Sequence, residues 1–214
     1  MKRVFIIAAA LIAALPMAHA TTYLFTSGTA GSSENVTVGG YKITVWGYDL
    51  TSQSGSGSNI SLNGGASALS YDSFGLGVAN TSNEVTLNSF VVVDFSDPAS
   101  PGPEGPKLAG ATTATIDIDN ADSGWIIYGG NTAPGAGGIG SLTQITSGSG
   151  NVASEVVSIT NYSYLAIVAA QTCELNIYSI IANTPGTVPE PGTFLMAGMA
   201  LIGLGAALRK TCKT

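Results

Sequence analysis

The chain has 214 residues, of which 9% are charged, and its formal net charge is −6. Between Thr21 and Thr187, two basic residues stand against twelve carboxylates, a net charge of −10. This balance excludes nucleic-acid binding, because no cationic surface could replace the counterions of the phosphates. The single histidine, His19, lies in a predicted leader. A Ser-His-Asp triad, a Cys-His dyad and a His-ligated metal centre are therefore excluded in the mature chain.

The first 20 residues form a predicted secretory signal peptide. Lys2 and Arg3 precede an apolar run from Val4 to Leu15, and Ala18 and Ala20 supply small residues at positions −3 and −1 of a cleavage site. An N-terminal membrane anchor is the alternative, but the apolar run is too short to span a bilayer comfortably. We expect cleavage after Ala20 and export through the inner membrane.

Residues 21–182 are predicted to form an all-β domain, an antiparallel β-sandwich or a jelly roll. Apolar and polar residues alternate in short runs, which Gly, Ser, Asn and Pro clusters separate, and no long helical period occurs. The expected strands are Thr22–Phe25, Tyr41–Tyr48, Ser67–Val78, Val85–Phe95, Thr112–Ile118, Trp125–Tyr128, Val152–Ile159, Tyr164–Ala170 and Leu175–Ile181. The expected long loops are Thr51–Ala66, Ser96–Gly110 and Gly129–Gly140.

The expected strand 41–48 has two faces of different chemistry. If the face with Ile43 and Val45 packs in the core, Trp46 and Tyr48 remain at the surface. Two flat aromatic rings about 7 Å apart can stack on sugar rings. Trp46 and Tyr48 are therefore the candidate glycan-binding residues. The alternative is that both rings pack beneath a long loop.

Asp117, Asp119 and Asp122 are the candidate metal ligands. Alternation places Asp117 and Asp119 on one face at the end of an expected strand, and Asp122 follows in the turn. Calcium prefers carboxylate and carbonyl oxygens, although the spacing is not that of an EF-hand loop. A solvated turn is the alternative. No other cofactor is expected.

Cys173 and Cys212 are the only cysteines. Cys212 follows a predicted membrane helix and would begin on the cytoplasmic side, so it cannot pair with Cys173. Cys173 is then either a small core residue at the start of the last strand or one half of an intermolecular disulfide.

The C-terminus combines three features in a fixed order. A Pro-rich linker over 183–192 ends in a Pro-Glu-Pro sequence, the apolar run Phe194–Leu208 follows, and Arg209 and Lys210 come directly after it. As a helix this run rises about 23 Å, which is short of the ~30 Å hydrocarbon core. The pattern predicts a single short transmembrane helix with its basic end in the cytoplasm and the body of the protein outside.

This order resembles the PEP-CTERM sorting signal of secreted and envelope proteins of Gram-negative bacteria. The matching residues are Val188, Pro189, Glu190, Pro191, Thr193, Arg209 and Lys210. The resemblance implies that an exosortase, a membrane-embedded cysteine transpeptidase, processes the chain near Pro-Glu-Pro. It also implies a host that makes exopolysaccharide or biofilm, and it makes 193–214 the sorting helix and basic tail. Thr211 and Cys212 interrupt the basic cluster, which is a departure from the pattern.

These features together predict a non-enzymatic protein of the cell surface or of the extracellular biofilm matrix. It would be anchored transiently in the membrane by its C-terminal helix and then transferred to the surface or the medium. Exopolysaccharide is its candidate ligand. The alternatives are a purely structural surface or matrix component with no specific ligand, and a glycan-acting hydrolase, which needs only a suitably spaced carboxylate pair.

Overall fold

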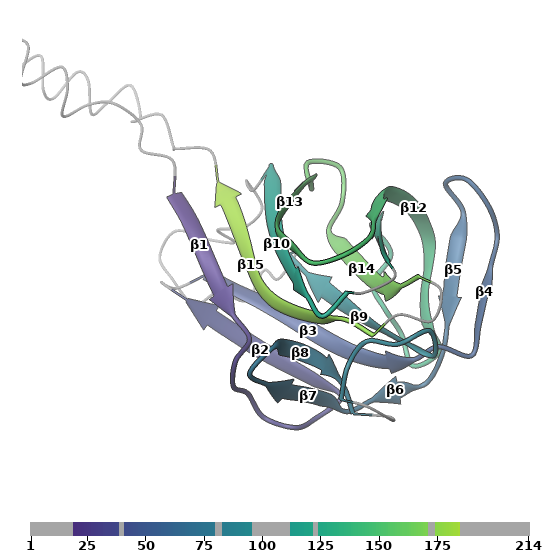
Figure 1. Ribbon diagram of the computed structural model, residues 1–214. Coiled ribbons are helices and arrows are strands. Elements are labelled where there is room, and N and C mark those ends of the chain that lie inside the picture. Colours follow the sequence, from purple (N-terminus) through teal and green to yellow (C-terminus); the bar gives the residue numbers. More distant parts are fainter. Residues whose placement is uncertain are drawn as a thin grey trace, which may run out of the picture. The chain divides into compact units, whose positions relative to one another are not determined.

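Two antiparallel sheets make up the part of the chain that the computed structural model describes, which is residues 19–38, 41–79, 83–95, 112–121, 124–170 and 174–184 (Figure 1). These residues form fifteen strands and no helix. The strands belong to one compact unit, Ala20–Thr184. The prediction of an all-β antiparallel fold is confirmed for these residues.

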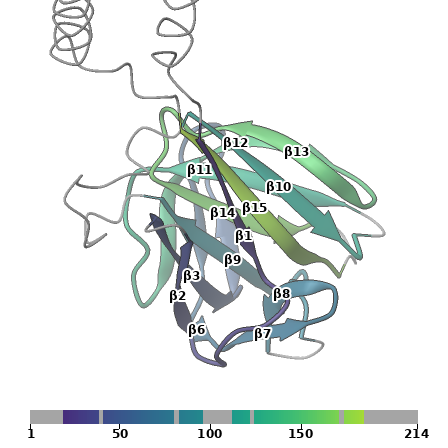
Figure 2. The ribbon, with the colours of Figure 1, turned by 90° about the vertical axis from the view of Figure 1, so that its left-hand side faces the viewer.

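The smaller sheet has six strands, with β15 at its centre. Its order is β13 (Val152–Ser158), β10 (Thr113–Asp119), β15 (Asn176–Thr184), β8 (Gly75–Val78) and β7 (Leu69–Asp72), and β1 (His19–Leu24) also pairs with β15. β10 occupies one edge of β15, so β1 and β8 share the other edge. Figure 2 shows β1 and β15 side by side in this sheet.

The larger sheet has nine strands. Its order is β2 (Ser33–Val38), β3 (Tyr41–Asp49), β9 (Ser89–Asp94), β14 (Tyr164–Ala169), β11 (Trp125–Gly130), β12 (Gly138–Gly148), β5 (Ile60–Asn63) and β4 (Ser52–Ser54), and β6 (Ala66–Ser67) pairs with β3. The register of β12 shifts between Ile139 and Leu142, and Ser141 between them has a φ of 56°. The β4–β5 hairpin thereby extends the sheet beyond β12.

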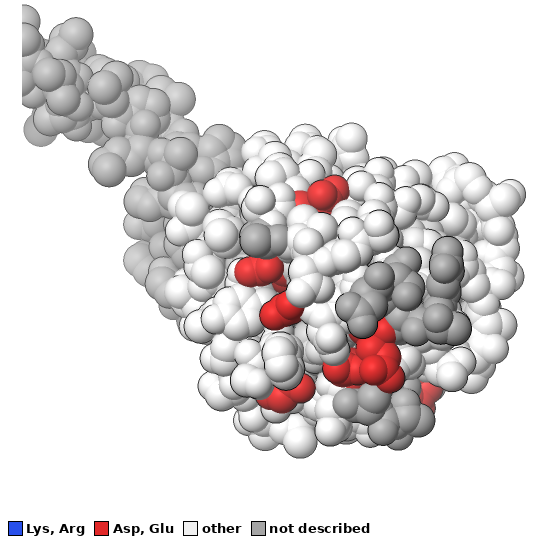
Figure 3. Space-filling model, viewed as in Figure 1, with Lys and Arg blue, Asp and Glu red and all other residues white. Residues whose placement is uncertain are grey.

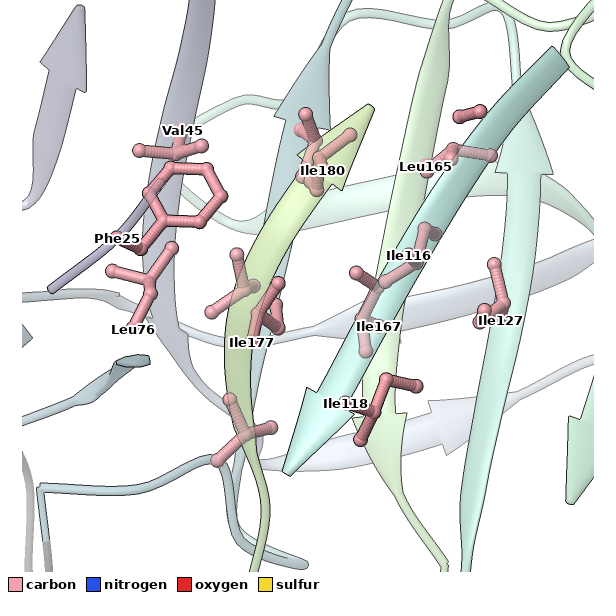
Figure 4. Close-up of a cluster of buried hydrophobic side chains, with 14 of the residues drawn as sticks. Phe25, Val45, Leu76, Ile116, Ile118, Ile127, Leu165, Ile167, Ile177 and Ile180 are labelled. Atoms are coloured by element: carbon pink, nitrogen blue, oxygen red, sulfur yellow. The ribbon is translucent and has the colours of Figure 1, made fainter. Parts of the chain in front are cut away.

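The main hydrophobic core lies between the two sheets. Alternate residues of the central strands of both sheets point into it, as period-two patterning requires. Ile43 and Val45 of β3 are fully buried there, which confirms the inward face predicted for this strand. Figure 4 shows the layer from close by; the labelled side chains include Ile116, Ile118 and Ile180 from the smaller sheet and Val45, Ile127 and Ile167 from the larger.

A second hydrophobic cluster covers the opposite face of the nine-stranded sheet. It contains outward residues of the central strands, such as Phe90, Val92 and Ala166, together with Leu62 of β5 and Leu142 of β12. Both faces of β9 and β14 are therefore buried, and every residue of these two strands has less than a tenth of its surface exposed. This outer cluster determines which side chains of β3 reach solvent.

Three predictions about local structure are wrong. The segment 51–66, expected to be a loop, contains β4, β5 and the start of β6. The expected loop 129–140 is shorter, because β11 ends at Gly130 and β12 begins at Gly138. The strand β2 was not predicted, because its sequence Ser-Glu-Asn-Val-Thr-Val carries few apolar residues, and its pairing with β3 supplies its backbone hydrogen bonds.

The predicted signal peptide up to Ala18, the linker beyond Thr184 and the sorting helix and basic tail lie outside the described residues. None of the described residues belongs to a helix long and apolar enough to cross a membrane. The beginning of β1 and the end of β15 lie at the same end of the unit, because these two strands run in opposite directions (Figure 1). Both extensions of the chain therefore start from that end.

The core between the sheets can be tested at Ile116, which is 0% exposed. We expect Ile116→Ala to lower the free energy of unfolding by about 2–5 kcal/mol, because it removes buried methyl groups and leaves a cavity. Val156→Ala is the matched control, because Val156 is 61% exposed on edge strand β13 and its loss should cost less than about 0.5 kcal/mol. Urea denaturation measures both, and equal losses would contradict the proposed core.

Candidate functional site

A row of polar side chains crosses the outer face of the nine-stranded sheet. Thr44 of β3 pairs with Asp94 of β9, and Asp94 pairs with Tyr164 of β14. Directly paired residues project from the same face of a sheet, so these three side chains are neighbours. Each is 8–9% exposed, at the border between the outer hydrophobic cluster and solvent. We call Thr44, Asp94 and Tyr164 the polar row.

The next row on the same face contains the aromatic residue Trp46. Trp46 pairs with Val92, which pairs with Ala166, and Ala166 pairs with Tyr128. The two small residues thus lie between two aromatic ones. Trp46 is partly exposed, whereas Tyr128 is 2% exposed and its hydroxyl accepts a hydrogen bond from Gln53 Nε2 of β4 at 3.1 Å. Trp46 is therefore the aromatic side chain of this row that solvent can reach.

Tyr48 is a correction to the sequence prediction. Its side chain is only 3% exposed, and its ring stacks on Phe90 with 4.9 Å between the ring centroids and 10° between the ring planes. Burial also raises the pKa of its hydroxyl. The expected exposed pair of aromatics is absent, because β5 and β12 bring Leu62 and Leu142 into the cluster that covers this part of the sheet. Trp46 alone keeps the predicted position.

Polar residues of β2 and β3 border the polar row. Thr44 Oγ1 donates a hydrogen bond to Asn35 Oδ1 on β2 at 2.8 Å, and Asn35 is itself exposed. Lys42 lies two residues before Thr44 on the same face, and it is the only Lys or Arg among the described residues. An indole, a carboxylate, hydroxyls, an amide and an ammonium group therefore gather on this edge of the face. Such a set can stack on a sugar ring and form hydrogen bonds to its hydroxyl groups.

The predicted calcium ligands are only partly described. Asp117 and Asp119 do lie on the same face of β10, both half-buried, whereas Asp122 lies outside the described residues. Burial, and then the charge of Asp119, raise the pKa of Asp117. Asp119 Oδ1 accepts hydrogen bonds from Asn120 N at 2.8 Å and from Asn151 Nδ2 at 2.6 Å. No group of three His, Cys, Asp or Glu in the described part of the chain forms a metal-binding set.

A carboxyl pair that the sequence did not reveal joins Glu84 to Glu174. Burial, followed by a hydrogen bond to Glu174 and the charge of Glu174, raises the pKa of Glu84 to about 7. The Asn120 side chain donates a hydrogen bond to Glu84 Oε1, which lowers the pKa of Glu84. The charge of Asp72 makes a smaller contribution that raises it. The pair joins residues 90 positions apart in the sequence, so no local pattern could have indicated it.

The remaining site predictions fall outside the described residues. These are Ala18 of the cleavage site, Cys173, and the sorting residues Val188, Pro189, Glu190, Pro191, Thr193, Arg209 and Lys210. Ala20, the last residue of the predicted leader, is exposed and lies in β1. Cleavage after Ala20 would leave β1 with Thr21, Tyr23 and the following Phe25, which are all buried.

Residues 187–210 match the PEP-CTERM protein-sorting motif. The match covers the Pro-Glu-Pro sequence, the apolar run and the basic pair, so the sorting-signal resemblance is confirmed for this segment. No curated protein sequence matches the chain.

Among solved structures, the chain is similar to a family 29 carbohydrate binding module complexed with mannohexaose, at 11% identity and a TM-score of 0.37 over 79% of this chain and 94% of that one. A family 29 module from Piromyces equi gives 8% identity and a TM-score of 0.36 over 80% and 95%. A family 89 glycoside hydrolase from Clostridium perfringens gives 18% identity and a TM-score of 0.28 over 46% of this chain and 10% of that chain. These likenesses are too remote to assign a ligand or an activity.

The carboxyl pair predicts an unusual dependence of stability on pH in metal-free buffer. Glu84 ordinarily ionises near pH 4.5, but in the folded chain it does so near pH 7. Below pH 4.5 the group is protonated in both states and has no effect. As the pH rises toward 7 the unfolded chain releases this proton first, so the folded state loses stability relative to it. Glu84→Gln should therefore raise the urea midpoint at pH 8 and leave it nearly unchanged at pH 4. Equal midpoints of the variant and the wild type at pH 8 would contradict the raised pKa.

Proposed function

We propose that this chain is a non-enzymatic exported protein that an exosortase processes and transfers to the cell surface or the extracellular matrix, where its β-sandwich binds exopolysaccharide. The match of residues 187–210 to the PEP-CTERM motif is the observation that carries the proposal. The leader before Thr21 and the cytoplasmic basic end predicted for Arg209 and Lys210 agree with this route.

The outer face of the nine-stranded sheet supports the glycan-binding part of the proposal. Trp46 offers an accessible ring beside the polar row, and Asn35 and Lys42 add polar groups at the border. Because residues of β5 and β12 cover Tyr48, Trp46 is the one accessible ring where the sequence predicted two. A single ring favours contact with one sugar unit of a polysaccharide. A surface that binds each unit weakly is suited to a polymer, because many such contacts add up along it.

The Glu84–Glu174 pair does not have the spacing of a glycoside hydrolase site. Glycoside hydrolysis needs two carboxyl groups about 5–9.5 Å apart, with a sugar between them. Glu84 and Glu174 instead hydrogen-bond to each other, which leaves no room for a sugar. A purely structural component of the matrix remains the second candidate, and the next experiment separates the two.

Affinity electrophoresis in gels that contain the host's own exopolysaccharide tests glycan binding. We expect the wild-type protein to be retarded, and Trp46→Ala to bind about two- to tenfold more weakly because the stacking contact is lost. Phe74→Ala is the matched control, since Phe74 is an aromatic residue that is 51% exposed in the β7–β8 turn of the other sheet. Its retardation should equal that of the wild type.

The outcome decides between the two candidates. Absence of retardation by this polysaccharide would favour the purely structural component. Equal losses in Trp46→Ala and Phe74→Ala would show that binding does not use the outer face. Circular dichroism of each variant verifies that the sheets are intact before binding is measured.

The sorting part is tested by the mass of the protein recovered from the surface or medium of its host. Exosortase processing should yield a chain that runs from Thr21 to near Pro189–Pro191 and lacks Cys212. Replacing Pro189, Glu190 and Pro191 with alanine should leave the tail attached and the protein in the inner-membrane fraction. Recovery of wild-type protein that still ends at Thr214 would contradict processing and make the tail an ordinary anchor.

A further inference from the structure

Asn176 is a buried polar side chain without a partner. The residue is 0% exposed, and neither its Oδ1 nor its Nδ2 has a hydrogen-bond partner. Leaving one buried amide atom unsatisfied costs about 1–3 kcal/mol, so a buried amide with two such atoms needs a physical explanation. It lies at the start of β15, between Leu175 and Ile177, which both point into the core. The Asn176 side chain therefore points to the outside of the six-stranded sheet.

Carboxylates surround Asn176 on that outer side. On one edge of β15 it pairs directly with Asp119 of β10. On the other edge an antiparallel bridge joins Val85 to Leu175, which places Glu84 beside Asn176. Glu174, two residues earlier on the same chain, projects from the same face because Leu175 between them points inward. Three acidic residues from three segments are therefore neighbours of one buried amide.

The Glu84 side chain passes over β15. It starts on the edge of β15 that carries the Val85–Leu175 bridge and accepts a hydrogen bond from Asn120, which follows β10 on the opposite edge. It also hydrogen-bonds to Glu174 on the way. Gly77 of β8 lets the backbone of this segment approach closely, because a Cβ there would collide with the Asn83 carbonyl and the Glu84 Cα. The crossing explains why Asn176 is buried although it points outward.

Among the described residues, no Lys or Arg lies on the sheet that carries this group. The acidic residues at and around Asn176 are Glu84, Glu174, Asp119 and Asp72. Lys42, the only described Lys or Arg, lies on β3 of the other sheet. Figure 3 shows acidic side chains at several places on one face of the molecule, and no Lys or Arg of the described residues is in view. The Asn120 amide and the hydrogen bond between the two carboxyl groups partly offset their repulsion, but neither is a positive charge.

We propose that Glu84, Glu174 and Asn176 form a calcium-binding site that joins the Glu84 segment to β15. Two carboxylates and one amide oxygen are typical calcium ligands, and an oxygen-only set does not favour zinc. Calcium accepts an irregular arrangement of ligands, whereas magnesium requires a near-ideal octahedron. The cation would give the Asn176 oxygen its missing partner and would offset the repulsion between the two carboxylates. The site differs from the one predicted at Asp117, Asp119 and Asp122.

Thermal denaturation of the full chain in EDTA and in calcium chloride tests the proposal, with magnesium chloride of equal ionic strength as the reference salt. Calcium at about a hundredfold excess over its dissociation constant should raise the melting temperature by about 5–10 °C, and magnesium should raise it much less. Calorimetric titration should give one calcium per chain. Glu174→Gln should weaken binding by about tenfold or more, because it removes a charged ligand.

Asn176→Leu separates the site from a merely structural role. Leucine has the same branching and the same number of side-chain heavy atoms as asparagine and removes the unsatisfied amide, so the variant should melt at or above the wild-type temperature in EDTA and yet lose the calcium response. Glu155→Gln is the matched control, because Glu155 lies on β13 and hydrogen-bonds to Thr146, and its calcium response should be unchanged.

Three results would overturn the proposal. The first is an equal melting temperature of the wild type in calcium and in EDTA, which would mean that water satisfies the amide. The second is a calcium response retained by both Glu174→Gln and Asn176→Leu. The third is a response that Asp119→Asn abolishes and Asn176→Leu leaves intact, which would place the cation at Asp117, Asp119 and Asp122 instead.

Discussion

A buried strand must hydrogen-bond along both of its edges, and the way in which β15 meets this requirement organises the six-stranded sheet. One edge is paired with β10 from Asn176 to Asn183. The other edge is divided among three segments: β1 reaches it through Phe25 N, which donates to Tyr178 O at 3.0 Å, β8 pairs at Ile177, and Val85 bridges to Leu175. Residues 175–184 thus hold the N-terminal strand, the β7–β8 hairpin and the Glu84 segment in one sheet.

The larger sheet meets a different requirement, because both of its faces are apolar at the centre. Its inner face packs on the smaller sheet, and the β4–β5 hairpin and the first part of β12 cover much of its outer face. This second layer buries the Tyr48–Phe90 stack and leaves the border near Trp46 accessible. The extent of β5 and β12 therefore determines which part of the outer face remains accessible to solvent.

Patterns within single strands were sufficient to predict the fold class and the inner core. Alternation placed Ile43 and Val45 inside and put Asp117 and Asp119 on one face of β10, and the structure agrees. Alternation did not reveal that both faces of β9 are buried, because the cover over Phe90 and Val92 comes from distant parts of the chain. Tyr48 was misplaced for the same reason, since its cover comes from residues 60–62 and 139–142.

The polar groups were harder still to predict, because they depend on the register between strands. Asp94 could have been noticed as an acidic residue that ends an apolar strand, but its neighbours Thr44 and Tyr164 are set by pairing alone. Glu84, Asn120 and Asn176 lie on three segments that only β15 and its partners bring together. Without coordinates or related sequences, such contacts have no signature in the chain.

The position of β15 also fixes the order in which an exported chain can mature. A polypeptide threaded through a secretion channel from its N-terminus presents β1 first and β15 last. The nine-stranded sheet is complete once residue 169 has emerged, but the other five strands of the six-stranded sheet then still lack their central partner. Until Thr184 arrives, the inner apolar face of the larger sheet has no complete cover and is prone to aggregation. The sorting motif begins only three residues after Thr184, at residue 187. The strand that completes the domain and the start of the sorting motif therefore emerge almost together.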